Sequence, residues 1–143
     1  IPTAIHLAAA SAIQDQLIPA LELLRDEMQK KATAFWPIIK TGRTHLQDAT
    51  PIRLGQEFQG YVGQAERSIK RARQALDEMS EVALGGTAVG TGVGTNSQFA
   101  PKVIVKLSKL TGVKLRETTN HFQAQSTLDN IVSASGAMIG IVT

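Results

Sequence analysis

Apolar residues recur at alternating steps of four and three along residues 58–83, which is the clearest pattern in the sequence. This spacing places them on one face of an α-helix, where they form a continuous seam against the rest of a fold. The opposite face is charged and includes Glu66 and Lys70, an i,i+4 pair in the favourable order. The pattern predicts one long amphipathic helix over about 55–83. Its apolar stripe consists of Phe58, Val62, Ala65, Ile69, Ala72, Leu76, Met79 and Ala83.

A second apolar stripe lies nearer the N-terminus and predicts a helix over about 18–35. Pro19 falls in its first turn, where a proline is tolerated. The residues before it predict another helix over about 3–16. We therefore divide the region into two helices, and the alternative is a single kinked rod, because the proline lies at their junction. The stripe comprises Leu17, Leu21, Leu24, Met28, Ala32 and Phe35.

Two further helices are predicted in the second half of the chain. The first begins near Asn96 or Ser97, which are both good N-caps, has Pro101 in its first turn, and ends at Gly112. The second follows a cap at residues 118–120 and continues to the end of the sequence. Its apolar positions include Leu128, Ile131, Met138 and Val142.

These patterns predict an all-α fold of long helices, a long-helix bundle. No segment alternates with period two for long, so we expect at most short strand pieces in an irregular loop at about 37–54. No repeat or linker interrupts the chain, and residues 1–143 are predicted to be a single segment of one domain. A helix over 55–83 would be about 43 Å long, whereas a compact globule of this length is about 37 Å across. The helices should therefore belong to a larger bundle, completed by further sequence, by other subunits, or by both.

Composition narrows the classes of function. The chain has no cysteine, which excludes disulfides, thiolate metal sites and cysteine nucleophiles. Its histidines lie far apart, so we expect no metal site. No apolar run approaches the roughly 20 residues of a membrane helix. The basic cluster at 67–73 is interleaved with acids and lacks aromatic neighbours, so we expect no nucleic-acid partner.

The loop at 37–54 is the best candidate for chemistry. It places cations, a hydroxyl, an imidazole, an amide and a carboxylate within nine residues, and His45 is the group whose ordinary pKa, about 6.5, suits proton transfer near neutrality. The alternative is that Thr44 and Asp48 cap turns while His45 bonds a backbone carbonyl. The polar set is Lys40, Arg43, Thr44, His45, Gln47 and Asp48.

A second loop, over 84–96, is rich in glycine. Its backbone N–H groups could bind an anion, but it matches neither a P-loop nor a dinucleotide fingerprint. A tight link between helices is the favoured interpretation for most of its residues. Of the other histidines, His6 is expected to pack or to bond solvent, and His121 to cap a helix or to pack. The loop glycines are Gly85, Gly86, Gly90, Gly92 and Gly94.

The polar loop also carries a resemblance. The segment Gly42-Arg43-Thr44-His45-Leu46-Gln47-Asp48-Ala49-Thr50-Pro51, followed by Leu54-Gly55-Gln56-Glu57-Phe58, closely resembles a signature of class II fumarases, in the fumarase/aspartase superfamily. The opening at 1–6 is similar to the sequence that follows a Ser-Ser-Asn-Asp motif in that family. Residues 83–92 resemble its glycine loop, and Asn120-x-Phe122 resembles a helix start. Aspartases carry Gln where His45 stands, and argininosuccinate and adenylosuccinate lyases differ in the residues that follow.

The resemblance implies a hydro-lyase that adds water reversibly to fumarate, in anti geometry, to give L-malate without metal or organic cofactor. His45 matches the proton donor and acceptor, and Thr44 matches a residue that hydrogen-bonds a substrate carboxylate. The alternatives are another superfamily lyase, of the aspartase or argininosuccinate lyase type, or a purely structural helical-bundle module.

The resemblance also implies an assembly. Each active site in the family is built from three subunits of a homotetramer around a central helix bundle. Residues 1–143 would be an incomplete, internal piece of that domain, with the family's Ser-Ser-Asn segment upstream and its catalytic Ser, Lys and Asn downstream. We therefore expect the isolated piece to be inactive. The compartment would be the cytoplasm for a bacterial member and the mitochondrion for a eukaryotic one.

Overall fold

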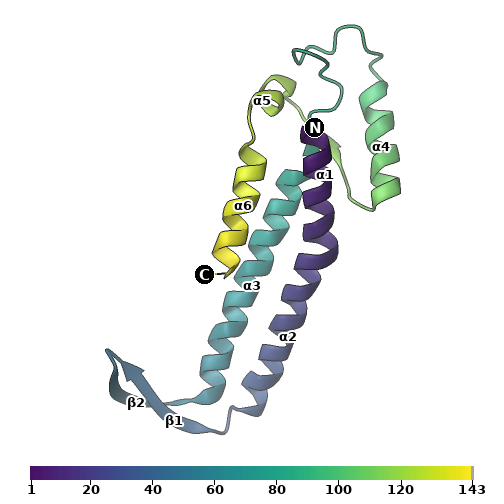
Figure 1. Ribbon diagram of the computed structural model, residues 1–143. Coiled ribbons are helices and arrows are strands. Elements are labelled where there is room, and N and C mark those ends of the chain that lie inside the picture. Colours follow the sequence, from purple (N-terminus) through teal and green to yellow (C-terminus); the bar gives the residue numbers. More distant parts are fainter. Residues whose placement is uncertain (143) are drawn as a thin grey trace. The chain divides into compact units, whose positions relative to one another are not determined.

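A computed structural model describes residues 1–142 and confirms the predicted fold class, an all-α fold with long helices (Figure 1). The chain divides into two compact units, one of residues 19–70 and one of residues 1–18 with those from Arg71 on. That residues 1–143 form a single segment of a larger domain remains a prediction. The helices are α1 (Pro2–Ala12), α2 (Ile18–Ala34), α3 (Leu54–Met79), α4 (Phe99–Thr111), α5 (His121–Ser126) and α6 (Asp129–Val142), and the strands are β1 (Ile39–Thr44), β2 (Gln47–Arg53), β3 (Glu81–Val82) and β4 (Arg116–Glu117).

The N-terminal helices follow one another without a break in helical structure. A π-helical turn, Ile13–Leu17, joins α1 to α2, and the N–H of Ile18 donates to the carbonyl of Ile13. Pro19 explains the turn, because proline has no N–H and its ring would clash with the carbonyl four residues earlier. Widening the helix immediately before the proline absorbs that conflict. Of the two interpretations of this region, the structure favours the continuous one.

In the unit of residues 19–70, the end of α2 packs against the start of α3. The rings of Phe35 and Phe58 meet edge to face with centroids 5.1 Å apart. Gly55 permits this approach, because a Cβ there would lie 2.5 Å from the carbonyl oxygen of Ala32 and 2.8 Å from the Cα of Trp36. The apolar stripe of α3 faces inward as predicted, and its buried members in this unit are Val62, Ala65 and Ile69.

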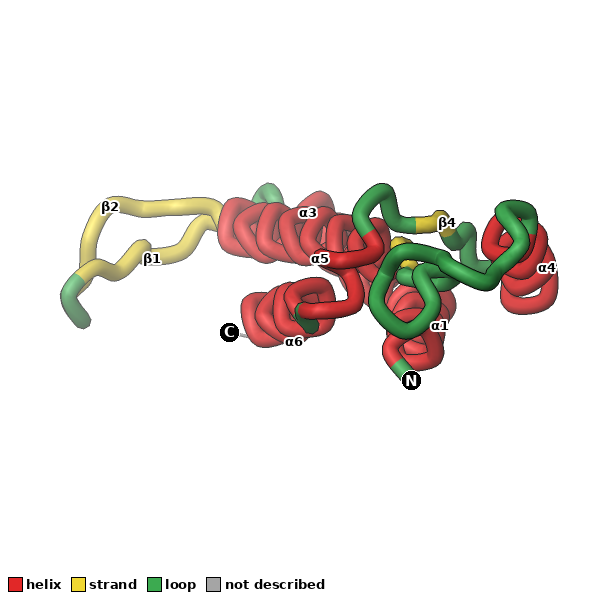
Figure 2. Tube along the Cα trace, turned by 90° about the horizontal axis from the view of Figure 1, so that it is seen from above, coloured by secondary structure: helices red, strands yellow, loops and turns green. Residues whose placement is uncertain are grey.

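Strands β1 and β2 replace the irregular loop expected at 37–54, and that expectation was wrong. They form an antiparallel hairpin, drawn in yellow in Figure 2, whose register runs from Ile39↔Arg53 to Thr44↔Gln47 with an irregularity between Thr41 and Arg43. Nearly all of its residues are exposed or half-exposed. A hairpin with no fully buried face shows no apolar alternation, so its sequence gives no period-two signal.

The other unit is built around the N-terminal helix, the last turns of α3 and the short parallel pair β3–β4, in which Glu81 pairs with Arg116. Its core is aliphatic, and the chain after β3 runs through the glycine loop to α4, β4, α5 and α6. Asn130 of α6 donates from its side chain to the carbonyl of Glu78, 3.0 Å away. The largest fully buried side chains are Ile13, Met79, Val82 and Val113.

Three helix boundaries differ from the predictions. The long helix ends at Met79 rather than near 83, because β3 begins at Glu81 and pairs with β4. The next helix begins at Phe99, since the Asn96 side chain caps a turn by accepting from the N–H of Gln98. Its predicted end is confirmed, with Gly112 left-handed at φ 74°. The last helix is broken into α5 and α6 by extended backbone at Thr127.

Candidate functional site

The turn of the β1–β2 hairpin holds the two predicted site residues. Thr44 is the last residue of β1 and pairs with Gln47, so that His45 and Leu46 form a two-residue turn. Both turn residues are left-handed, with φ of 51° and 60°. Such a turn matches the twist of the strands but normally uses Asn or Gly. Holding residues with larger side chains there costs roughly 1–2 kcal/mol each, which points to a use for those side chains.

The base of the hairpin is fixed to the helices on either side. Lys40 forms an ion pair with Glu57 at 2.6 Å, with both side chains about two-thirds buried. Arg53 donates to the carbonyl of Trp36 at 2.9 Å, and its guanidinium lies 5.8 Å from the centroid of that indole. The N–H of Leu54 donates to the carbonyl of Ile38. These contacts orient the strands where they leave the helical pair.

The turn itself is open. Thr44 and His45 are both exposed, and in the described part of the chain the His45 imidazole has no hydrogen-bond partner. The alternative in which His45 bonds a backbone carbonyl is therefore not what the structure shows. Asp48 pairs with Arg43 across the strands, at 3.2 Å. The turn thus presents an accessible imidazole beside an accessible hydroxyl, which can move a proton and donate a hydrogen bond to an anionic substrate.

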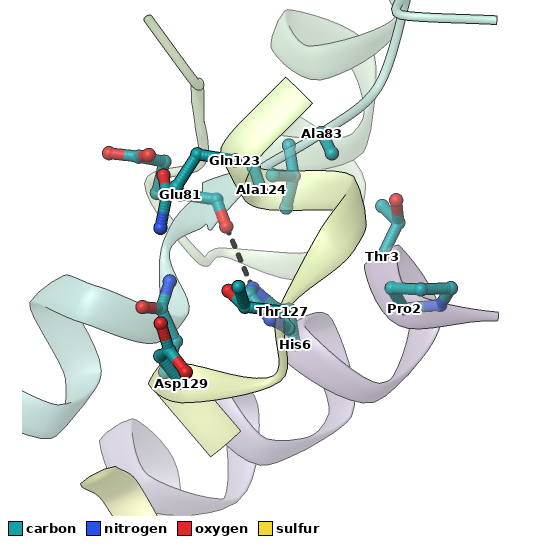
Figure 3. A pocket seen from close by; sticks show the side chains of 11 residues that line it. Pro2, Thr3, His6, Glu81, Ala83, Gln123, Ala124, Thr127 and Asp129 are labelled. Atoms are coloured by element: carbon teal, nitrogen blue, oxygen red, sulfur yellow. Dashed lines mark hydrogen bonds between the residues drawn. The ribbon is translucent and has the colours of Figure 1, made fainter. Parts of the chain in front are cut away.

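The other histidines hold backbone segments together. The Nδ1 of His6 lies 2.7 Å from the carbonyl oxygen of Glu81, as the dashed line in Figure 3 marks. The cavity drawn there has a volume of about 20 Å³, room for about one water molecule. Of the packed and the solvent-bonded roles expected for His6, the contact with Glu81 favours the packed one. His121 starts α5, and its Nε2 lies 3.2 Å from the carbonyl of Leu84 and 3.3 Å from a carboxylate oxygen of Glu117.

The glycine loop is bound closely to α5. The side chain of Gln125 donates to the carbonyl of Thr87 at 3.0 Å, and a Cβ on Gly86 would lie 2.6 Å from the Nε2 of that glutamine. Gly85 and Gly90 are left-handed and approach Ala100 and α5 respectively. These contacts support the interpretation as a tight link, because the glycines provide positive φ and room for close packing.

Sequence reasoning overlooked one residue of the hairpin turn. Leu46 stands beside His45 with 98% of its surface exposed. The sequence shows Leu46 only as an apolar residue in the middle of a polar segment. Its exposure could be inferred only once residues 45 and 46 were known to form a two-residue turn. Arg43 and Asp48 were recognised as polar candidates, but their pairing required the register of the hairpin.

Two features that the described residues lack bear on other classes of function. Among residues 1–142, no three His, Asp or Glu side chains are grouped so that they could hold a metal ion. Over the same residues, no helix combines the length and the apolar character that crossing a membrane requires.

Comparison with known proteins places the chain in a family. The sequence model of a family described as Lyase matches residues 1–143. Class II fumarate hydratase of Neisseria meningitidis is 53% identical over 137 residues, which are 96% of this chain and 30% of that protein. Mitochondrial fumarate hydratase of Saccharomyces cerevisiae is 48% identical over 96% of this chain and 28% of its own length.

A solved structure agrees with these relatives. The crystal structure of class II fumarase from Schistosoma mansoni superimposes with a TM-score of 0.92 at 31% identity, over 97% of this chain and 32% of that one. The chain spans about 30% of the length of the curated relatives that it matches. The resemblance noted in the polar loop is confirmed, and the chain belongs to the Lyase family.

Proposed function

We propose that the protein containing this chain is a fumarate hydratase, which adds water reversibly to fumarate to give L-malate. The observation that carries the proposal is the hairpin turn, which presents the His45 imidazole and the neighbouring Thr44 hydroxyl to solvent in a segment resembling the class II fumarase signature. Relatives about half identical to the chain are named fumarate hydratases, which supports the same conclusion.

The chemistry assigns a different role to each residue. Hydration of fumarate requires a proton to be added to, or removed from, a carbon next to a carboxylate, and the negative charge then develops on that carboxylate. The His45 imidazole moves a proton in this step, directly or through a bound water. The Thr44 hydroxyl donates a hydrogen bond to a carboxylate of the substrate, where it stabilises charge. The other groups that the reaction needs come from segments outside this chain.

We further propose that the active site is assembled between subunits of a homotetramer, packed through the helices. Several large apolar residues on the helices are at least 40% exposed, a pattern typical of surfaces that other helices cover. A chain with one segment of such a site would be inactive alone. These residues include Leu23 and Leu24 on α2, and Val132, Met138 and Ile139 on α6.

Two other functions would use the same fold. A lyase of the aspartase or argininosuccinate lyase type would act on another succinyl compound, and a structural module would have no substrate. The imidazole at position 45 favours the hydratase over an aspartase, because aspartases carry a glutamine at this position of the signature. A fumarate hydratase would serve the tricarboxylic acid cycle, in the cytoplasm of a bacterium or the mitochondrion of a eukaryote.

The substrate is tested by assaying the complete protein with malate, aspartate and argininosuccinate in parallel. The expected result is formation of fumarate from malate alone, followed by its ultraviolet absorbance. Turnover of aspartate or argininosuccinate instead would reassign the substrate within the family. No turnover of any of the three by a correctly assembled protein would favour the structural module.

A further inference from the structure

The segment of residues 82–116 is basic and contains no acidic side chain. Five of the chain's 15 Lys and Arg lie in it, and none of its 12 Asp and Glu does. The formal charge of the segment, +5, exceeds the +3 of the whole chain, so the remaining residues are slightly acidic. The positive charge of the chain is therefore concentrated in this segment. Its cations are Lys102, Lys106, Lys109, Lys114 and Arg116.

Three of these lysines share one face of α4. Lys102, Lys106 and Lys109 follow one another at steps of four and three, which aligns them along about 10 Å of the helix. The opposite side of the helix is buried through Ala100 and Ile104, which are 4% and 5% exposed. All three lysines are exposed. Packing of α4 on its own unit therefore directs this lysine face, residues 102, 106 and 109, toward solvent.

The charges of the lysine face are not compensated. Within residues 1–142, neither these three lysines nor Lys114 forms an ion pair. By contrast, Lys30 pairs with Glu27 and Lys40 with Glu57, both at 2.6 Å. Helix stability does not explain the arrangement either, because a first turn favours acids and that of α4 has none. A concentrated positive potential of this kind favours an anionic partner.

Exposed apolar side chains flank the lysine face on both sides. By helical geometry, Val105 lies along one edge, and Phe99 and Leu110 lie along the other. Their exposed fractions are 54%, 48% and 73%, respectively. Lysines beside exposed apolar residues are typical of a helix at the surface of an anionic membrane. There the ammonium groups meet the headgroups, and the apolar side chains enter the boundary with the acyl chains.

The residue types favour a lipid surface over an acidic protein. Lysine is depleted from protein interfaces, where arginine is enriched because its planar group binds carboxylates in a fixed geometry. The lysine face contains no arginine. A compact ammonium on a flexible stem suits a fluid layer of headgroups, which imposes no fixed geometry on its partner.

We propose that the lysine face of α4 binds the surface of an anionic lipid membrane. The contact is peripheral, with α4 lying along the headgroups and the core of its own unit behind it. The inference is independent of the proposed function, because none of these residues belongs to the hairpin that carries His45.

The test is co-sedimentation of the complete protein with vesicles of phosphatidylcholine containing about 30% phosphatidylserine. We expect binding at about 0.05 M salt, loss of binding at about 0.5 M salt, and none to pure phosphatidylcholine. The triple variant Lys102→Gln, Lys106→Gln, Lys109→Gln removes the lysine face but keeps good helix formers. Because each lysine near such a surface contributes about fivefold in affinity, the variant should bind about 10²-fold more weakly.

The matched control removes the same charge from α3, as Arg67→Gln, Lys70→Gln, Arg71→Gln. These cations are exposed but lie among acids, so the control should bind within about threefold of the unsubstituted protein. Size-exclusion chromatography and circular dichroism verify that both variants are folded and assembled. Equal losses in the two variants would show attraction by net charge alone and overturn the proposal. So would binding of polyglutamate without binding of the anionic vesicles, which would assign the face to an acidic protein.

Discussion

Arg43 and Asp48 face each other across the hairpin, with the guanidinium Nε and a carboxylate oxygen 3.2 Å apart, and one further pair, Thr44–Gln47, separates them from the turn that holds His45. Both side chains are about 70% exposed, so water screens the pair and its contribution to folding is small. We expect Asp48→Asn to change the free energy of unfolding of the complete protein by less than about 1 kcal/mol. Denaturation curves of the two proteins, measured at low and high salt, test this.

The same pair flanks the turn and can limit the orientations of its imidazole. We therefore expect D48N to lower kcat by a few-fold, even though it hardly changes the free energy of unfolding. High salt should lower kcat of the unsubstituted protein more than that of D48N, because salt screens an exposed ion pair. Equal salt sensitivity of the two proteins would show that the ion pair does not orient the turn.

The imidazole of His45 is the group on which the proposed hydratase activity depends most. Replacing it by Asn in the complete protein removes the proton-transferring group, and losses for such groups are about 10²–10⁴-fold in rate. We expect this loss in kcat with the oligomeric state unchanged, because the side chain is exposed and supports no core contact. Steady-state assays combined with size-exclusion chromatography measure both properties.

His6→Asn is a suitable control for that substitution. The side chain of His6 approaches the carbonyl of Glu81 through Nδ1, at 2.7 Å. The amide nitrogen of Asn can replace Nδ1 as a donor to that carbonyl. H6N should therefore keep its kcat, whereas H45N loses it. Full turnover by H45N would instead favour the structural module over the enzyme.

The hydroxyl of Thr44 is tested by a pair of substitutions. Thr44→Val keeps the β-branched shape, which suits the last position of β1, but removes the donor to the substrate carboxylate. Thr44→Ser keeps the hydroxyl. Because a hydrogen bond to a charged group is worth about 1.5–3 kcal/mol, we expect T44V to lower kcat/KM about tenfold to 10²-fold. The kcat/KM of T44S should stay close to that of the unsubstituted protein. Equal losses of kcat/KM in T44V and T44S would argue against a contact with the carboxylate.

Residue patterns predicted the helices better than the hairpin. The stripe along α3 was visible because one of its faces is buried, and burial imposes the helical period on the sequence. The hairpin over 39–53 has no fully buried face, so no apolar pattern marks its strands. His45 could be selected from its chemistry and from the resemblance. The left-handed turn could not be predicted, since Leu46 is not a residue type that favours positive φ and the segment lacks the Asn-Gly pair typical of such turns.

The close contact between α2 and α3 gives a prediction about folding that is independent of catalysis. Gly55→Ala would place a Cβ 2.5 Å from the carbonyl oxygen of Ala32 and 2.9 Å from the N of Trp36, and both neighbours are backbone atoms that cannot rotate away. The helices must then separate, and overpacking of this kind costs about 1–3 kcal/mol. The separation also moves the base of the hairpin, because Leu54 bonds to Ile38 there. We therefore expect a lower melting temperature and a lower kcat together.

Gly63 provides the matched control on the same helix, because a Cβ there meets no atom within 4 Å. Ala has a higher helix propensity than Gly by about 1 kcal/mol, so Gly63→Ala should raise the melting temperature of the complete protein while G55A lowers it. Scanning calorimetry of the two variants under one set of conditions gives the comparison. If both substitutions raised the melting temperature, helix propensity would outweigh the backbone clash at Gly55, and α2 and α3 would have to tolerate a wider spacing than the one observed.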